Sequence, residues 1–277
     1  MHETVNRYPR IPWSNSRGFT LVELVVVIIV VSILAVGVPT FIGQTVSTYV
    51  ETTERQASFL NGKMAIERIS RELRAALPVS VRVSADNLCL EYLPIVAASR
   101  YLTLTSPDSP TALEVADFNL TLSAGTNYYA VTYPINTSDV FDVNSNTIAP
   151  IDTIIDADPS DGQVTVNLTL ATLYQHSPGR RFFVVSDPIS YCALGAPSGL
   201  LNRYTGYGLS ATQPTTFAVS GSALLSELQV NNGGPIAVFD HLPGTQHRNS
   251  IVQLRFDLLS RNENLRLDHE IHIRNAP

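Results

Sequence analysis

One acidic side chain stands alone in the most hydrophobic stretch of this sequence. Residues 19–43 have the sequence FTLVELVVVIIVVSILAVGVPTFIG and contain a single charged residue, Glu23. A carboxylate inside a membrane-spanning helix costs about 3 kcal/mol unless it finds a partner or lies close enough to the helix start to reach the lipid headgroups. We therefore expect Glu23 either to pair with a group outside its own helix or to extend towards the headgroups.

The sequence contains two cysteines, Cys89 and Cys192. They form no CxxC motif and no Cys/His cluster, which disfavours a zinc site. A single pair in an exported domain can form a disulfide bond, and two unrelated buried thiols are the alternative. The spacing alone does not decide between these two states.

An acidic loop over residues 156–162 resembles a calcium-binding loop. Its candidate ligands are Asp156, Asp158 and Asp161. The EF-hand pattern fails, however, because Asp161 stands where a glycine is required and Asn167 stands in place of the closing glutamate. Asp-Gly is also an ordinary turn signal between strands. These three residues are therefore weak calcium candidates, and we expect no metal and no other cofactor.

Catalytic motifs are missing from the sequence, which contains neither G-x-S-x-G nor a phosphate-binding loop of the Walker type. His269 and His272 lie on a predicted strand, whose period of two places them on opposite faces. Tyr204 and Tyr207 have side chains that can stack on a sugar or a base, although a loop packing on its own tyrosines is the simpler interpretation. A formal net charge of −6 disfavours nucleic acid as a partner. We expect no enzyme activity.

A membrane-spanning helix is the element that must position Glu23. About 20 apolar residues cross a bilayer core, and residues 19–43 are long enough. A secretory signal peptide would have a shorter apolar core and a small-residue cleavage site after it, which is not evident here. Three arginines precede the stretch and Glu51 is the first charge after it. The positive-inside rule therefore places residues 1–18 in the cytoplasm and translocates the rest.

A second helical segment follows the apolar stretch. Pro39 weakens the first helix, since proline removes a backbone hydrogen bond. Spacings of three and four then recur in two runs, from Val46 to Met64 and from Ile66 to Leu77, and Pro78 ends the pattern. Residues 44–78 are therefore predicted to form an amphipathic helix whose apolar stripe packs on a sheet.

The remaining chain is predicted to be rich in β-strands. The clearest alternation of apolar and polar residues covers 163–170, and the segments 251–256 and 265–273 form a predicted hairpin through 260–264. Other candidate strands are 79–83, 87–91, 101–105, 118–122 and 181–185. We predict one α+β unit without a firm internal boundary, in which a long N-terminal helix packs on a β-rich domain over residues 79–277.

The junction from Arg17 to Glu23, with the sequence RGFTLVE, resembles the prepilin peptidase site of the type IV filament superfamily. This resemblance implies cleavage between Gly18 and Phe19 on the cytoplasmic side and N-methylation of Phe19. It implies that Glu23 pairs with the terminal amine of a neighbouring subunit. It also makes residues 1–18 a leader peptide, 19–43 a transmembrane or filament-core helix, and 79–277 a periplasmic pilin-like domain.

Three further segments, 65–78, 185–192 and 269–277, resemble the O-type minor pilin of mannose-sensitive haemagglutinin (MSHA) pili. The resemblance implies a single-pass inner-membrane protein, or one at the pilus tip on the cell surface, that helps to initiate or cap a pilus. The implied partners are other minor and major pilins, prepilin peptidase and the inner-membrane assembly platform. A J-type minor pseudopilin of type II secretion and a pilin-anchored adhesin or sugar-binding module are the alternatives.

Overall fold

The structure is a computed structural model that describes residues 18–105, 111–169, 173–194, 199–226, 228–229, 237–244, 248–260 and 263–274. The expected leader, except for its last residue, lies outside these ranges. The chain divides into two compact units, residues 1–53 and 54–277. Each unit is described by itself below.

The described part of the first unit is mainly the beginning of a long helix, α1 (Leu21–Arg74), which is long and apolar enough to cross a membrane. Every residue from 18 to 49 is exposed. The hydroxyls in this stretch bond back to the helix: Ser32 donates to the carbonyl oxygen of Ile28 at 2.7 Å and Thr40 to that of Val36 at 2.8 Å. These polar groups are thus satisfied without water, as a lipid environment requires.

The second unit begins on α1, whose face towards the sheets is lined largely by small residues. Gly62 allows the closest approach, because an added Cβ would lie only 2.5 Å from Leu267 Cδ1 and 2.9 Å from Leu258 Cδ1. Leu60 and Met64, two members of the predicted apolar stripe, are 55% and 62% exposed instead. The buried positions of α1 are Ser58, Gly62, Ala65, Ile66, Ile69, Ser70 and Leu73.

Helix α1 ends at Arg74, three residues before the end of the predicted pattern. Beyond this point the backbone pairs with the segment after strand β2 (Cys89–Tyr92): the amide of Leu77 donates to Leu93 at 2.8 Å, and that of Ile95 donates to Ala75 at 2.9 Å. Pairing with an extended segment satisfies these groups, so the last predicted helical turn does not form.

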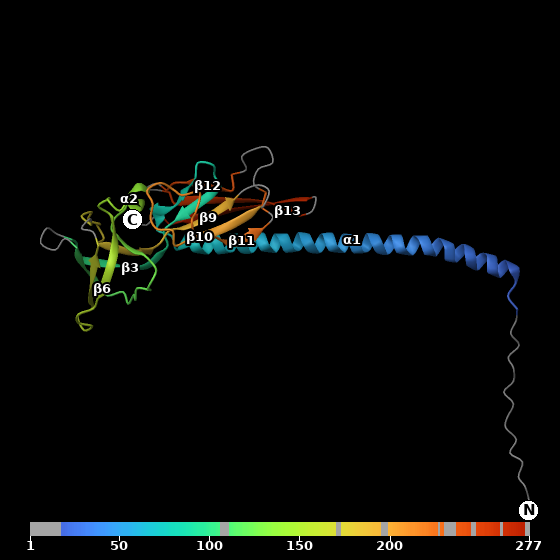
Figure 1. Ribbon diagram of the computed structural model, residues 1–277, viewed down its shortest axis with the longest axis horizontal. Helices are drawn as coiled ribbons and strands as arrows, with labels where there is room; N and C mark the ends of the chain where they lie inside the picture. Colours follow the sequence, from blue (N-terminus) through green and yellow to red (C-terminus); the bar gives the residue numbers. More distant parts are fainter. Residues whose placement is uncertain are drawn as a thin grey trace, which may run out of the picture. The chain divides into compact units, whose positions relative to one another are not determined.

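Two antiparallel sheets face the C-terminal part of α1, which lies alongside them in Figure 1. The first has the order β1-β2-β9-β10-β11 and the second the order β12-β13-β14. Their core joins α1 to both sheets, for example through Ile69, Tyr191 and Phe256. The new strands are β1 (Arg82–Val83), β9 (Ile189–Leu194), β10 (Leu200–Thr205), β11 (Ser222–Ser226), β12 (Phe239–Leu242), β13 (Ser250–Ser260) and β14 (Glu263–Ile273).

A closed six-stranded barrel is inserted between β2 and β9, which are themselves neighbours in the first sheet. Tyr92 and Ile189 are opposite each other in register, so the chain leaves the sheet and returns at one point. The barrel has its own core, which includes Val115, Val166 and Phe182. In barrel order its strands are β3 (Ile95–Thr103), β4 (Ala112–Ala116), β7 (Gln163–Leu168), β6 (Ile148–Ile155), β5 (Tyr128–Val131) and β8 (Arg181–Ser186).

The predicted fold class, a long N-terminal helix followed by a β-rich domain that contacts it, is confirmed. Strands occur at the strongest alternations, in β7, β13 and β14, and β13 and β14 form the predicted antiparallel pair. The segment 118–122 contains no strand, and a short 3-10 helix, Pro78–Ser80, precedes β1 where a longer strand was predicted. The internal boundary that the sequence did not reveal is the inserted barrel.

Candidate functional site

The start of α1 brings the predicted processing and assembly residues together. Gly18 and Phe19 precede the helix in an exposed, non-helical segment, and Phe19 is 76% exposed. The hydroxyl oxygen of Thr20 accepts a hydrogen bond from the backbone amide of Glu23 at 3.3 Å. Thr20 therefore occupies the N-cap position of α1, and Glu23 is the third helical residue.

At this position Glu23 can also stabilise the start of its own helix, a role that the sequence analysis did not consider. Threonine at the N-cap with glutamate at the third helical position is the capping-box pattern, and an acidic group there also interacts favourably with the helix dipole. The signal was present in the sequence as Thr-x-x-Glu over residues 20–23. The carboxylate of Glu23 is exposed and makes no ion pair within the described part of the chain. Any positive partner must therefore come from elsewhere.

Cys89 and Cys192 are joined by a disulfide bond, the first of the two states that the sequence left open. The two residues are directly opposite each other on β2 and β9, with their Cα atoms 4.1 Å apart and 103 positions apart in sequence. Both are buried. The bond thus crosslinks β2 and β9, the two strands between which the barrel is inserted.

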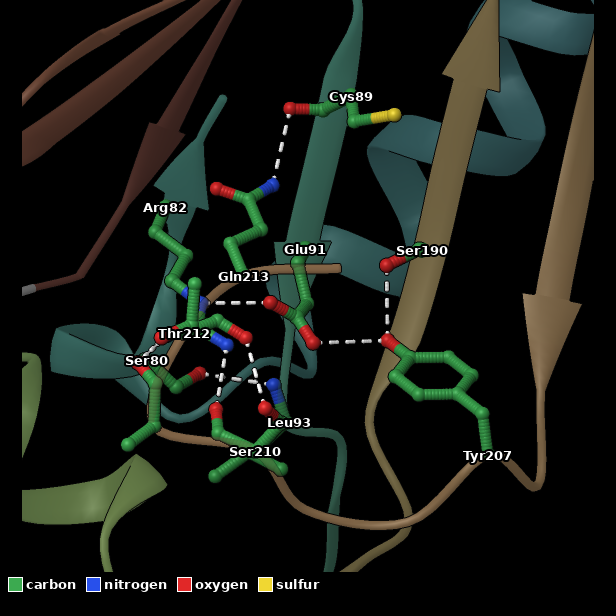
Figure 2. Close-up of polar contacts among 11 residues, drawn as sticks. Ser80, Arg82, Cys89, Glu91, Leu93, Ser190, Tyr207, Ser210, Thr212 and Gln213 are labelled. Carbon is green, nitrogen blue, oxygen red and sulfur yellow. Dashed lines mark hydrogen bonds and ion pairs between the residues drawn. The ribbon is translucent and has the colours of Figure 1, made fainter. Parts of the chain in front are cut away.

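A buried carboxylate lies on the same face of this sheet, away from α1. Glu91 is next but one to Cys89 on β2, and its side chain is fully buried. Figure 2 shows it between Arg82, which forms an ion pair with it across β1 and β2, and Tyr207, whose hydroxyl donates to its Oε1 at 2.9 Å. The hydroxyl of Ser190 is 2.7 Å from that of Tyr207. Burial raises the pKa of Glu91, although Arg82 and Tyr207 oppose the shift.

Arg82 connects this carboxylate to the segment after β10. Its guanidinium donates to the carbonyl oxygens of Ser210 and Ala211, both at 2.8 Å, and lies 3.6 Å from the ring centroid of Phe141 in the short helix α2 (Ser138–Phe141). Gln213 also donates to the backbone oxygen of Cys89 at 3.2 Å (Figure 2). Because the carboxylate of Glu91 is enclosed by these contacts, the arrangement holds a loop against a sheet and offers no room for a substrate.

The two tyrosines that the sequence singled out are turned inwards. Tyr204 stacks on Phe217 with centroids 4.1 Å apart, and Tyr207 meets the same ring edge-on at 5.0 Å. Together they cover the disulfide of Cys89 and Cys192. Both rings are therefore engaged in packing within the domain, as the simpler interpretation of the sequence expected.

A second cluster, around the half-buried acid Glu72, links the end of α1 to the first sheet. Glu72 accepts hydrogen bonds from the hydroxyl of Tyr92 at 2.6 Å and from Arg203 at 3.1 Å, and it pairs with Arg68 at 3.2 Å. Burial pushes the pKa of Glu72 upwards, but the bonds from Tyr92 and Arg203 outweigh it and leave the pKa below its usual value. The pair with Arg68 has the i,i+4 spacing that a helix brings together, whereas the contacts from the distant strands have no signal in the sequence.

The three weak calcium candidates lie on the exposed turn between β6 and β7. Asp158 accepts from the backbone and hydroxyl of Ser160, which lower its pKa, and Asp161 accepts from the amide of Gln163 at 2.7 Å. These contacts cap the turn. Asp156 makes no contact of this kind, and the described residues contain no cluster of three or more potential metal ligands.

Comparison with known proteins bears on the N-terminal part of the chain. A family model described as the prokaryotic N-terminal methylation motif matches residues 13–39. No curated protein and no solved structure matches the chain. The matched range contains Gly18, Phe19 and Glu23 and ends at Pro39 inside α1. The chain therefore carries a type IV pilin-like N-terminus.

Proposed function

We propose that the chain is a minor pilin that assembles with other minor pilins to initiate or cap a type IV pilus of the MSHA kind. The observation that carries this proposal is the methylation motif over residues 13–39, placed at the capped start of a helix that is apolar and exposed. Proteins with this N-terminus are generally structural subunits and not enzymes. Major pilins and the inner-membrane assembly platform are further partners in the proposal.

In this proposal, prepilin peptidase cleaves the bond between Gly18 and Phe19, and the new amine of Phe19 is methylated. The exposure of both residues ahead of α1 supports this step, because a protease needs an extended, accessible backbone. Glu23 then pairs with the terminal amine of a neighbouring subunit. The absence of a cation beside Glu23 in the described part of the chain agrees with a partner from another molecule.

The proposed location is the inner membrane, with residues 19–43 in the bilayer or the filament core, the helix of 44–78 following, and residues 79–277 in the periplasm. The disulfide between Cys89 and Cys192 supports an oxidising compartment for that domain. The apolar N-terminal part of α1 is consistent with inner-membrane anchoring. At the tip of a pilus, the same domain would lie at the cell surface.

Mass spectrometry of the protein purified from its own membrane tests the processing step. The expected N-terminal residue is methylated Phe19, and a mature chain that begins near residue 40 contradicts the proposal. Gly18→Val should block cleavage, whereas Gly43→Val is the matched control, because its site within α1 is open on all sides. Both variants should still insert in the membrane.

Gene deletion tests the role in assembly. Deletion should reduce the number of surface pili while the major pilin remains in the membrane, and the protein should co-purify with other minor pilins through residues 19–77. A deletion that blocks secretion across the outer membrane and leaves pili unchanged would favour the J-type pseudopilin instead.

The inserted barrel favours one alternative, a binding module carried on a pilin anchor. A barrel with its own core between β2 and β9 is not needed to cover α1, since the sheets already do so. If deletion leaves pili normal in number but abolishes attachment to a particular sugar, this adhesin function replaces the role in initiation.

A further inference from the structure

Three arginines line one cavity where the end of α1, the barrel and the end of β14 meet. They are Arg74 at the last position of α1, Arg181 at the start of β8 and Arg274 directly after β14. The cavity has a volume of 310 Å³. Its remaining wall is apolar and is formed by Ala76, Pro78, Ile95, Phe183 and Ile273.

None of these three guanidinium groups has a carboxylate partner among the described residues. Among the other described arginines, ion pairs with an aspartate or a glutamate are formed by Arg68, Arg82, Arg203, Arg255 and Arg266. Arg71, Arg100, Arg180 and Arg248 form no such pair with a described residue, so the cavity is distinguished by bringing three unpaired guanidinium groups to one place. Three positive charges, all on exposed side chains, thus share one cavity without an anion from the described residues. Like charges at such a site repel each other unless an anion lies between them.

The barrel strengthens this excess of positive charge. Arg100 on β3 is directly opposite Arg181 on β8, and like charges in directly opposite positions destabilise an antiparallel pair. The segment 95–186 contains nine acidic residues and only three basic ones, Arg100, Arg180 and Arg181. All three basic residues thus lie on or beside β3 and β8 in an otherwise acidic segment, and one of them, Arg181, lines the cavity.

We propose that this cavity binds a small oxyanion, a carboxylate or phosphate group attached to a compact carbon skeleton. Planar guanidinium groups bind both kinds of oxyanion through paired hydrogen bonds, and several of them favour a ligand with more than one negative oxygen. The apolar wall, which includes Ile95 and Phe183, packs against the carbon part of the ligand. The volume of 310 Å³ fits a small organic acid or a phosphate ester.

A ligand in this position would connect three parts of the molecule. Arg74 belongs to α1, Arg181 to the barrel and Arg274 to the end of the second sheet. One bound anion would therefore hold the barrel against the rest of the domain. Binding would also relieve the repulsion between Arg100 and Arg181, so that the anion contributes to stability as well as to recognition.

Titration of the full-length protein in detergent micelles tests this site. Inorganic phosphate and citrate are added separately at an ionic strength held constant with sodium chloride, and heat release and melting temperature are measured. We expect saturable binding of at least one of the two anions and a rise in melting temperature. Arg181→Gln and Arg274→Gln should each weaken binding at least tenfold, while Arg248→Gln, at an exposed site elsewhere, should not.

A stability measurement without added anion distinguishes a binding role from a structural one. Because the three charges repel each other, Arg181→Gln should melt at the same temperature as the parent protein or higher when no anion is present, and should lose the anion-induced rise. Binding of phosphate alone identifies a phosphorylated ligand, and binding of citrate alone identifies a carboxylate. Absence of saturable binding, or equal weakening by Arg248→Gln, overturns the proposal.

Discussion

At the scale of single residues, the helix-capping position of Glu23 can be tested separately from its proposed role in assembly. Its backbone amide donates a hydrogen bond to the hydroxyl of Thr20, and its side chain occupies the third helical position, where the capping-box pattern has its acid. Its carboxylate, in contrast, has no positive partner within the described part of the chain. The cap requires an amide or acid side chain, whereas pairing with a neighbour's amine requires the negative charge.

Glu23→Gln and Glu23→Ala separate these two functions. Glutamine is accepted in a capping box, so Glu23→Gln should keep the helix start and remove only the charge. If the charge pairs with a neighbouring subunit, both variants should insert in the membrane and enter pili several times less efficiently than the parent protein. Quantitative immunoblots of sheared pili against membrane fractions measure the ratio. Normal assembly of the glutamine variant would show that capping alone is required.

The disulfide supports a second prediction at this scale. A bond between residues 103 positions apart removes a large amount of chain entropy from the unfolded state, equivalent to about 4–5 kcal/mol. Replacing Cys89 and Cys192 together with alanine should lower the free energy of unfolding by this order, as measured by urea denaturation. The parent protein unfolded in the presence of a reductant is the matched control and should show a similar loss. An unchanged urea midpoint in both samples would contradict the prediction.

At the scale of elements, the end of α1 is held by charge as well as by apolar packing. Glu72 binds Tyr92 on β2 and Arg203 on β10, so it links the helix to two strands of the first sheet. Its lowered pKa means that the unfolded chain binds more protons than the folded one near the usual glutamate pKa. The stabilisation is therefore fully present above that pKa, about 4.5, and is lost as the pH falls below it.

Glu72→Gln tests this contribution. The substitution should lower the free energy of unfolding at pH 7 by about 1–3 kcal/mol, because Arg203 loses its charged partner in a half-buried site. It should also make stability less dependent on pH below 4.5. Glu67→Gln, on the exposed side of the same helix, is the control and should change neither quantity. Equal acid sensitivity of Glu72→Gln and the parent protein would refute the assignment.

The elements also explain how far the sequence could predict this fold. Hydrophobicity and the Arg-Gly-Phe junction locate the start of α1 and the methylation motif, since both are local properties. The later part of the predicted apolar stripe, with Ile66, Ile69 and Leu73, is buried as expected. The earlier part was predicted wrongly, because the helix contacts the sheets there through Ser58, Gly62 and Ala65 while the larger Leu60 and Met64 are exposed. The three arginines of the proposed anion site lie far apart in the sequence, at positions 74, 181 and 274, and only the folded chain brings them together.

At the scale of the whole domain, the barrel is an insertion into a sheet that is complete without it. β2 and β9 pair directly, from Cys89 opposite Cys192 to Tyr92 opposite Ile189. The barrel strands form their ladders with one another, apart from the bond of Ile95 to Ala75, and their core is separate from the one that contains α1. A smaller cluster, which includes Leu77, Leu93 and Phe141, joins the two parts. This arrangement separates the part that contacts the anchor helix from the part that is free to acquire a binding function.

Removal of the barrel tests this separation. Replacing residues 93–188 with Asn-Gly would connect Tyr92 to Ile189 through a two-residue turn, the length that suits directly opposite residues of a hairpin. The shortened chain should fold, form the bond between Cys89 and Cys192, and enter the membrane. Disulfide formation is measured by gel mobility without reductant, and folding by protection from protease.

Removing the barrel would expose apolar residues of the cluster that joins the two parts of the domain, so a second variant is needed. Leu77 is buried against the barrel and would face solvent after its removal, so a second shortened chain should also carry Leu77→Thr. If the barrel serves binding and the rest serves assembly, both shortened chains should still co-purify with other minor pilins through α1, while any specific surface attachment is lost. A shortened chain that forms its disulfide but no longer associates with other pilins would place the assembly contacts on the barrel itself.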